Sequence, residues 1–373
     1  MIFISFCFKH KEGGYNKKLY QVYHALSRQG HTIHLICAER LPVSGDQIFQ
    51  SVVSAPHSDR ETRLFWIVFC IKTVVKAYAI SRKYRIKAIV NFGALYGFLG
   101  FLPVMFKNIP SIVFIRGDNM KHSADRLRNH VFFVLDGLGI WLAKKVVFNS
   151  KAVSDVYRKR YGIKREKCAY IPNHIEHTFR YGCEERSRLR KAFGVAENEF
   201  LLTTSGILNP GKNFEFLIRA LAFLPARAVK LMIIGDEIVT NGQKSFLKRL
   251  SRLNRVDDTV IFCGWQNDPR PYIASSDAFV FPSRHEGMPN SLLEALSCQV
   301  PCFGSNISEI REVLKYRDLL FSIQDHQEYV KLIKRLISDK KFYLKTRELS
   351  RRRCREFIFD WDQETTRFVL ESL

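Results

Sequence analysis

Short apolar runs alternate with longer amphipathic stretches along almost the whole chain, and this alternation limits the possible folds more than any other feature. The runs are rich in β-branched and aromatic side chains and do not alternate in polarity. Strands that are buried on both faces of a sheet have this composition. The sequence therefore predicts an α/β fold in which helices cover both faces of parallel sheets.

The expected strands fall into two series along the chain. The first series is Ile2–Phe8, Thr32–Ala38, Ala88–Phe92, Ser111–Ile115, Lys145–Asn149 and Cys168–Ile171. The second series is Phe200–Ser205, Val229–Ile234, Val260–Cys263, Ala278–Phe281, Pro301–Phe303 and Leu319–Phe321. Helices are expected between them, for example at Tyr15–Gln29, Asp125–Ala143 and Asn213–Leu224.

The pattern runs twice, because each half opens with a strand, a glycine-containing loop and a helix. The seam lies near Ile171-Pro172-Asn173-His174, and a polar stretch follows it. We therefore expect two doubly wound, Rossmann-like domains, residues 1–172 and 173–356, that face each other across a cleft. Ligands bind at the carboxyl ends of the strands in such sheets.

The net charge of the chain is strongly positive and unevenly distributed. Lys and Arg number 59 against 36 Asp and Glu, a net charge of +23. Residues 1–172 hold 28 basic and 10 acidic residues, a net +18, so the rest of the chain carries only +5. A basic surface attracts nucleic acid, anionic lipid headgroups or phosphorylated substrates, and charge alone does not choose between them.

Cysteine usage indicates a reducing compartment. The nine cysteines are odd in number and include no Cys-x-x-Cys pair, and no histidine cluster has zinc-binding spacing. Residues Met1–Phe8 are expected to form a first buried strand and not a secretory signal. We therefore expect a cytoplasmic protein.

Two apolar segments of the first half raise the question of a membrane. Ala88–Phe106 has no charged residue, but it contains glycines and Pro103, so a buried strand followed by a partly buried helix is favoured over a membrane span. An apolar face that dips into a membrane surface stays open as an alternative. Arg63–Arg85 mixes aromatic residues with lysines and arginines, as an interfacial helix does.

Two loops have the character of anion-binding sites. Gly13 and Gly14 lie between the first strand and the first helix, where glycines allow close backbone approach to a ligand, although a plain tight turn explains them equally well. The matching loop of the second half contains Gly206 and places Lys212 at the start of a helix. A cation there conflicts with the helix dipole unless an anion offsets it, which favours a diphosphate site. Neither loop matches the dinucleotide or Walker glycine pattern.

The segment Phe281–Ala295 carries the most chemistry. A strand is expected to end at Phe281, and a loop with Arg284 and Glu286 leads to a helix that begins near Asn290. Glu286 is expected to project from the loop and Glu294 to face inward from the second helical turn. Carboxylates accept hydrogen bonds from paired hydroxyls, so the two acids suit a sugar and a ribose, and the helix amino terminus suits phosphate. Two surface glutamates are the plain alternative, but an acid amid apolar helix residues needs a partner.

Glu286 and Glu294 together resemble the E-x7-E signature of retaining glycosyltransferases of family four, which have the GT-B fold. Further segments follow in the family's order. They are Gly13-Gly14, Asn149-Ser150, Ile171-Pro172-Asn173-His174-Ile175, Lys212, Ile234-Gly235-Asp236, Phe262-x-Gly264-Trp265, Asp277–Ser283, Pro301, Glu309 and Glu312, and Phe359-Asp360-Trp361. The Glu286–Glu294 block is specific, and the other segments are weak singly and strong as a series.

The resemblance assigns a role to each domain. It implies an acceptor-binding first domain, to which about residues 357–373 cross back, and a second domain that binds a nucleotide sugar. It implies that Glu286, Lys212 and Asp118 are catalytic, and that Gly13 and Arg116 lie on the acceptor side. The donor-binding residues implied are Gly14, Gly206, Lys212, Arg284, Glu286, Gly287, Met288, Asn290, Ser291, Leu292 and Glu294.

Three positions depart from the family pattern. Ile207 stands where the family usually has an arginine, which leaves Lys212 and Arg284 to offset the diphosphate. The segment Ile115-Arg116-Gly117-Asp118 stands where members often have a histidine. Gln299 replaces a customary glycine.

The resemblance implies transfer of a hexose or N-acetylhexosamine from a nucleotide sugar, most simply a UDP-sugar, with retention at the anomeric carbon. The basic, aromatic first half favours a lipid-linked or saccharide acceptor in surface polysaccharide assembly, with the enzyme peripheral on the inner face of the cytoplasmic membrane. No cofactor or metal is expected, and the nucleotide sugar is a substrate. Alternatives are a GT-B epimerase acting on a nucleotide sugar and, more remotely, a basic nucleic-acid-binding protein.

Overall fold

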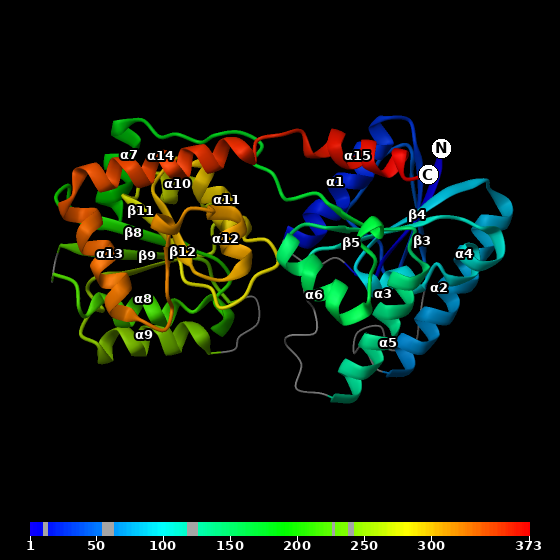
Figure 1. Ribbon diagram of the computed structural model, residues 1–373, viewed down its shortest axis with the longest axis horizontal. Coiled ribbons are helices and arrows are strands. Elements are labelled where there is room, and N and C mark those ends of the chain that lie inside the picture. The colour runs from blue at the N-terminus through cyan, green and yellow to red at the C-terminus, as the bar shows by residue number, and fades with distance from the viewer. Residues whose placement is uncertain (10–13, 54–62, 118–125, 226–227, 238–241) are drawn as a thin grey trace. The chain divides into compact units, whose positions relative to one another are not determined.

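The structure is a computed structural model of residues 1–373, and it describes all of them except 10–13, 54–62, 118–125, 226–227 and 238–241. The chain divides into two compact units. Unit 1 comprises Met1–Pro172 together with Asp360–Leu373, and unit 2 comprises Asn173–Phe359. Each unit is built around one parallel sheet with helices on its faces (Figure 1). The expected α/β architecture is therefore confirmed.

The sheet of unit 1 contains seven parallel strands among the residues described. They are β1 (Ile2–Cys7), β2 (Thr32–Cys37), β3 (Ile48–Val52), β4 (Ile86–Phe92), β5 (Ser111–Ile115), β6 (Lys145–Phe148) and β7 (Cys168–Tyr170), in the spatial order β3-β2-β1-β4-β5-β6-β7. The helices are α1 (Gly14–Arg28), α2 (Arg63–Lys83), α3 (Ala94–Phe98), α4 (Phe101–Lys107), α5 (Arg126–Leu142), α6 (Lys151–Tyr161), the short η2 (Arg165–Lys167) and α15 (Trp361–Glu371).

The apolar runs of unit 1 form its central strands because these strands are covered on both faces. Every residue of β5 is buried, and so is all of β4 except Lys87. The uncharged segment 88–106 contains the end of β4 and the helices α3 and α4, as the sequence predicts. The last helix of the chain, α15, packs on the first helix, α1. Arg28 of α1 pairs with Asp362 of α15.

Strand β3 is missing from the sequence prediction because it lies at the edge of the sheet. It pairs only with β2 in the described residues, and Phe49 and Val52 are about half exposed. An edge strand needs no continuous apolar run, so its sequence gives little signal. The other expected strands agree with the observed ones to within two residues.

The sheet of unit 2 contains six parallel strands in the part of the unit that is described. They are β8 (Phe200–Ser205), β9 (Val229–Ile234), β10 (Val260–Gly264), β11 (Ala278–Phe281), β12 (Cys302–Ser305) and β13 (Leu320–Phe321), in the spatial order β10-β9-β8-β11-β12-β13. The helices are α7 (Cys183–Ala192), η3 (Pro210–Lys212), α8 (Phe214–Leu221), α9 (Gln243–Leu253), α10 (Arg270–Ala274), α11 (Asn290–Ser297), α12 (Ser308–Leu314), η4 (Arg317–Leu319), α13 (His326–Ser338) and α14 (Lys340–Glu356).

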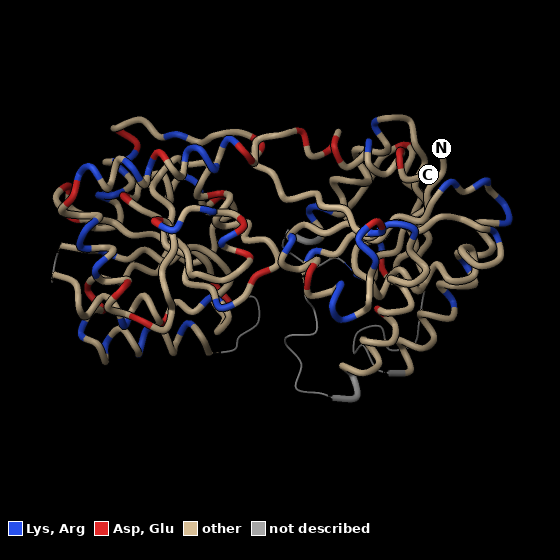
Figure 2. The backbone as a smooth tube through the Cα atoms, in the orientation of Figure 1, with Lys and Arg blue, Asp and Glu red and all other residues tan. Residues whose placement is uncertain are grey.

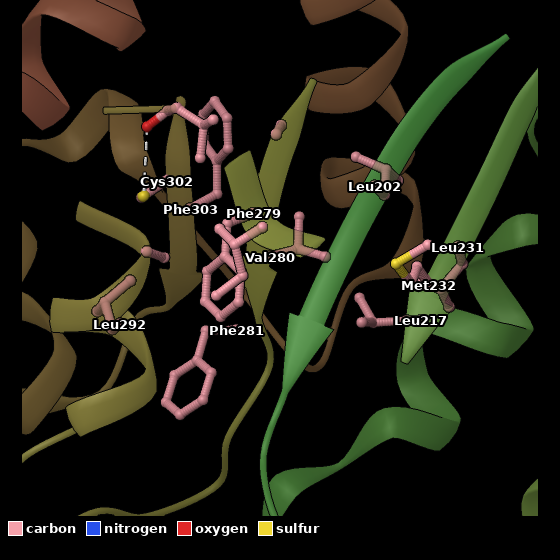
Figure 3. Packing of buried hydrophobic residues seen from close by; sticks show 14 of the residues in the cluster. Leu202, Leu217, Leu231, Met232, Phe279, Val280, Phe281, Leu292, Cys302 and Phe303 are labelled. Atoms are coloured by element: carbon pink, nitrogen blue, oxygen red, sulfur yellow. Dashed lines mark hydrogen bonds between the residues drawn. The ribbon is translucent and has the colours of Figure 1, made fainter. Parts of the chain in front are cut away.

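The core of unit 2 lies on both sides of β8 and β11. Phe279 and Phe281 of β11 are fully buried, and Leu292 of α11 packs in the same cluster (Figure 3). This packing fixes the carboxyl ends of β8 and β11 and the start of α11. Those three places carry the residues of the candidate site.

Candidate functional site

Two glycines let the loops after β8 and β9 come into backbone contact. Gly206 and Gly235 have φ of 149° and 131°, which L-residues rarely adopt. A Cβ atom on Gly235 would lie 2.0 Å from the carbonyl oxygen of Gly206, and one on Gly206 would lie 3.2 Å from Cε of Lys212. A side chain at position 235 would clash with the backbone of Gly206, and one at position 206 would be strained and would press on the end of the Lys212 side chain. The Lys212 side chain therefore lies beside the backbone of Gly206, at the end of β8.

Lys212 ends the short helix η3, immediately before α8. Asn209 caps η3 by accepting a hydrogen bond from the Lys212 amide at 3.2 Å, and Asn213 takes a left-handed conformation with φ of 56°. The chain then starts again as a helix at Phe214, so two short helical segments meet at this point. The expectation that Lys212 stands at the beginning of a helix is confirmed.

The lysine and the first glutamate of the Glu286–Glu294 block meet in space. Lys212 Nζ lies 2.7 Å from Glu286 Oε1 and 4.8 Å from the centre of the Phe281 ring. The two charged side chains are only 18% and 11% exposed, so the pair is partly removed from water. An anionic ligand can replace the carboxylate at the ammonium group, and a ligand hydroxyl can donate to the carboxylate.

The loop between β11 and α11 is fastened to the loop after β8. The Arg284 amide donates to the Gly211 carbonyl at 2.9 Å, and the Asn213 side chain donates to the Pro282 carbonyl at 3.1 Å. The Arg284 guanidinium contacts Asn213 and, at 3.1 Å, Glu215. Arg284 therefore pairs with Glu215, at the start of α8, and not with Glu286. The sequence did not predict Glu215 as a partner of Arg284.

Helix α11 begins at Asn290, as expected, and its first turn carries several of the predicted residues. Asn290 accepts a hydrogen bond from Asn173 of the segment that precedes α7, and Ser291 is half-buried. Met288 is buried beside half-buried Gly287. Leu292 has its side chain in the core and its amide bonded to the Pro289 carbonyl, so it supports the site by packing.

Glu294 lies on the second turn of α11, half-buried between apolar neighbours. Its charge acts on Arg270 of α10. A hydrogen bond to Asp268 is the main cause that raises the pKa of Arg270, and the charge of Glu294 contributes. Arg270 was not among the residues predicted from the sequence, because nothing in its own segment indicates that α10 lies beside α11.

Asp236, at the end of β9, is a third acid beside the glycine loops. Its Oδ2 lies 2.6 Å from Lys244 Nζ, and the hydrogen bond from Lys244 is the largest effect that lowers the pKa of this carboxyl. Asp236 is therefore ionised over the whole neutral range. The segment Ile234-Gly235-Asp236 thus lies beside the loop after β8, and backbone hydrogen bonds connect the two.

Unit 1 carries the residues expected on the acceptor side. Arg116 lies with its guanidinium 5.8 Å from the Trp361 ring of α15, and its carbonyl accepts a hydrogen bond from Asn149. Lys18 of α1 lies over the same ring at 4.4 Å. Gly14 is the first residue of α1, whereas Gly13 and Asp118 lie outside the described residues.

The Asp360-x-Asp362 pair has protein partners. Asp360 caps α15 by accepting a hydrogen bond from the Gln363 amide at 2.9 Å, and Asp362 accepts from Gln21 and Arg28. Asp360 is thus the N-cap of α15. Within the described ranges there is no group of three or more His, Cys, Asp or Glu side chains that could hold a metal ion.

Two family models match the chain, one for each half. Residues 13–179 match the model described as "Glycosyltransferase Family 4", and residues 185–353 match "Glycosyl transferases group 1". Both matched ranges include residues of the candidate site. Glu286, Glu294 and Lys212 lie in the second range and Gly14 and Arg116 in the first.

Individual proteins are similar over different lengths of the chain. The UDP-Gal:alpha-D-GlcNAc-diphosphoundecaprenol alpha-1,3-galactosyltransferase of Escherichia coli is 24% identical over 86% of this chain and 84% of its own. The N-acetylgalactosamine-N,N'-diacetylbacillosaminyl-diphospho-undecaprenol 4-alpha-N-acetylgalactosaminyltransferase of Campylobacter jejuni is 26% identical over 58% of this chain and 56% of its own. The crystal structure of Anabaena Alr3699/HepE in complex with UDP matches with a TM-score of 0.79 and 19% identity over the full length of both chains, which shows the fold.

Proposed function

Because this chain belongs to the group 1 glycosyltransferases of the GT-B fold, we propose that unit 2 binds a nucleotide sugar and that the enzyme transfers its sugar with retention of anomeric configuration. The observation that carries the proposal is the 2.7 Å contact between Lys212 and Glu286 at the ends of β8 and β11. A half-buried ammonium beside a half-buried carboxylate suits a ligand that has a diphosphate next to a hydroxyl-rich ring.

Each residue of unit 2 has a proposed task. Lys212 binds the diphosphate, assisted by the amide groups at the start of α11 near Asn290 and Ser291. Glu286 accepts hydrogen bonds from the sugar hydroxyls and Glu294 from those of the ribose. Gly206 and Gly235 keep the loops free of side chains, so that the diphosphate can approach the backbone.

The proposed reaction breaks the bond between the anomeric carbon and the diphosphate oxygen and forms a bond from the acceptor oxygen on the same face of the sugar. The transition state has oxocarbenium character, and negative charge grows on the leaving diphosphate. Lys212 and the helix amides stabilise that charge, which is the part that a metal ion plays elsewhere. The acceptor proton passes to the departing phosphate oxygen, so no side-chain nucleophile is required.

The proposed donor is a UDP-hexose or UDP-N-acetylhexosamine, and the proposed acceptor is a lipid-linked or saccharide acceptor at the inner face of the cytoplasmic membrane. Support comes from the names of the E. coli and C. jejuni relatives, which both contain a diphosphoundecaprenol acceptor, and from the UDP in the Anabaena structure. Both family models describe glycosyltransferases, so an epimerase and a nucleic-acid-binding protein are not favoured.

The proposal is tested with a panel of radiolabelled nucleotide sugars and a detergent-dispersed lipid diphosphate acceptor. We expect transfer from one or a few UDP-sugars without added metal and in the presence of a chelator. The product's anomeric configuration, read from its proton NMR coupling, should match that of the donor. Inversion, or full dependence on a divalent metal, would contradict the proposed mechanism.

Lys212→Ala is the variant that tests the diphosphate site. We expect transfer to fall by about a hundredfold or more, since one charge-stabilising donor contributes about that much in other active sites. Lys345→Ala is the matched control, because Lys345 also forms an ion pair, with Asp318 at 2.6 Å, but on the surface of unit 2. Equal activity of the two variants would remove Lys212 from the site.

A further inference from the structure

Helix α2 is apolar on two opposite faces, and only one of them contributes to the core. Phe65, Phe69 and Ala77 are at most 1% exposed and pack in one hydrophobic cluster of unit 1. The opposite face is formed by large apolar side chains that are 55–59% exposed and spaced by three or four residues, Leu64, Ile67, Ile71 and Val75. In the described residues, Leu64–Lys83 alone has the length and hydropathy to cross a membrane. Because its other face is built into the core, this helix cannot leave unit 1 to span a bilayer.

Two neighbouring helices add to the exposed apolar surface. Phe106 of α4 is 68% exposed, and its ring meets the Tyr78 ring of α2 edge-on at 6.5 Å. Helix α5 presents a second stripe at three- and four-residue spacing, formed by Val131, Val134, Leu138 and Trp141. Trp141, near the end of α5, is 64% exposed. Aromatic residues of this kind are typical of membrane interfaces.

These helices lie on one side of the sheet of unit 1. Helices α2, α3, α4 and α5 connect the consecutive parallel strands from β3 to β6, and right-handed crossovers in one direction place their helices on the same face. Helices α2 and α4 are in contact, as are α4 and α5. Helices α1 and α15 cover the other side (Figure 1). We call the exposed surface of α2, α4 and α5 the α2–α4–α5 face.

The exposed charges on α2, α4 and α5 are all basic among the residues that the structure describes. From Arg63 to Gly117 the sequence contains no Asp or Glu, whereas it contains Arg63, Lys72, Lys76, Arg82, Lys83, Arg85, Lys87, Lys107 and Arg116. Lys72 and Lys76 of α2 are exposed, and so is Lys107, which follows Phe106 in the sequence. Figure 2 shows where Lys and Arg and where Asp and Glu lie along the backbone. The one acid of α5, Asp136, is buried. A partner of this face must therefore offer an apolar layer bounded by negative charge.

We propose that the α2–α4–α5 face binds the surface of an anionic membrane, with its apolar side chains in the headgroup region and its lysines and arginines against lipid phosphates. A bilayer surface supplies both the apolar layer and the negative charge, and amphipathic helices bind it in this way. Large apolar side chains that are exposed together on neighbouring helices are typical of a surface that binds a partner or a membrane. The inference rests on the proposed lipid-linked acceptor, and it names the surface by which the enzyme reaches that substrate.

Vesicle flotation without any donor sugar tests the proposal. We expect the wild-type protein to bind vesicles of equimolar phosphatidylglycerol and phosphatidylcholine at least tenfold more tightly than vesicles of phosphatidylcholine alone. The variant I71S/F106S should lose at least tenfold in affinity for the anionic vesicles. The matched control is F223S/L253S, which removes two apolar side chains of unit 2 that are 63% and 73% exposed and should bind as the wild type does.

Three results would overturn the proposal. One is an absence of vesicle binding, and another is binding that I71S/F106S leaves unchanged, since adsorption by charge alone does not require the apolar stripe. The third is self-association through this face, seen as a wild-type dimer in sedimentation velocity that I71S/F106S converts to a monomer. Loss of binding with an unchanged urea midpoint supports the proposal and excludes misfolding.

Trp141 gives an independent signal. Its emission should shift to shorter wavelength and be quenched by brominated lipid when vesicles bind. The W141F variant should lose this change, whereas W265F, which replaces a half-exposed tryptophan of unit 2, should keep it.

Transfer to a detergent-dispersed acceptor separates the proposed function from the proposed membrane surface. Vesicle binding without transfer counts against the proposed function alone, and transfer without vesicle binding counts against this surface alone.

Discussion

Lys212 can reach Glu286 because glycines, and not side chains, occupy positions 206 and 235. A Cβ atom at either position would press on the lysine or on the neighbouring backbone. The position of the Lys212–Glu286 pair thus depends on the two glycines as well as on the contact between the two charged groups. For this reason the loops after β8 and β9 form one structural part, although 28 residues lie between Gly206 and Gly235 in the sequence.

Replacing Glu294 with Ala tests the second acid of the block. We expect transfer to be lost while the far-ultraviolet circular dichroism and the urea midpoint stay close to those of the wild type, because in the proposed function this half-buried carboxylate binds the ribose of the donor. Glu348→Ala, which removes a partly exposed glutamate of α14 that pairs with Arg352, is the control and should keep full activity. Wild-type turnover in the Glu294 variant would remove this residue from the site.

The residues that carry charge at strand ends could be predicted from the sequence, whereas their partners could not. Lys212 and Glu286 stand out because each follows a buried strand and precedes a helix. The pairing of Arg284 with Glu215 and the contact of Asn173 with Asn290 depend on how distant segments pack. Leu292 was expected to bind the donor, and its side chain lies in the core.

At the scale of single elements, the turns and edges are where the sequence is least informative. Buried strands such as β5 and β8 follow directly from their apolar runs. The edge strand β3 does not, because none of its five residues is fully buried. The turn after α11 differs, because there the residue type itself, a glutamine at a customary glycine position, indicates a strained backbone at Gln299.

Gln299 follows α11 with φ of 59°, a left-handed conformation that costs a non-glycine residue about 1 kcal/mol or more. The family resemblance implies that a glycine is customary at this position. We expect Gln299→Gly to stabilise unit 2 by about 0.5–1 kcal/mol, the relief of strain exceeding the extra freedom of the unfolded chain. The check is the urea midpoint of unit 2. A lower midpoint than that of the wild type would contradict this prediction.

His34 of β2 makes the stability of unit 1 sensitive to pH. Its ring stacks on Tyr84 at 4.7 Å and on Phe49 at 5.6 Å, and burial together with the charge of Lys83 lowers the pKa of the imidazole. The unfolded chain therefore binds this proton more readily than the native protein does. Its contribution to stability is full above a pH of about 6.5, the unfolded value, and is lost as the pH falls through the lower native pKa.

His34→Phe keeps the stacked ring and removes the titration. Between pH 7.5 and pH 5 we expect the urea midpoint of unit 1 to fall less in this variant than in the wild type, while the two proteins agree more closely at pH 7.5. The midpoint is read from the labelling of buried cysteines described below. An identical pH dependence in both proteins would exclude His34 as the cause.

At the scale of the whole molecule, unit 1 is closed by a segment that returns to it after unit 2. Trp361 of α15 is 1% exposed and is flanked by Lys18 and Arg116. The sequence predicts this return only through the family resemblance, because the helix signal of residues 360–371 does not say which unit it joins. The stability of unit 1 therefore depends on α15 as well as on residues 1–172.

Trp361→Ala should destabilise unit 1 by about 3 kcal/mol or more, the cost of removing a fully buried aromatic side chain. Pulsed thiol labelling in urea can follow each unit, because Cys7 and Cys37 are buried in unit 1 and Cys302 and Cys354 in unit 2. We expect the unit 1 cysteines to react at lower urea in the variant and the unit 2 cysteines to react as before. Trp141→Ala, at an exposed position, should leave both sets within about 0.5 kcal/mol of the wild type.

A simultaneous shift of both sets of cysteines would show that the two units unfold as one. Burial raises the pKa of the Cys354 thiol to about 11, so native-state labelling at neutral pH is slow and does not obscure the unfolding signal.

The placement of α15 against α1 also sets the order in which the protein can be completed during translation. A ribosome that has finished α1 must still synthesise all of unit 2 before Trp361 emerges from its exit tunnel. Until then, the surface of α1 that α15 covers stays uncovered in the nascent unit 1. A chain truncated before residue 360 would keep that surface of α1 uncovered even after unit 2 has folded.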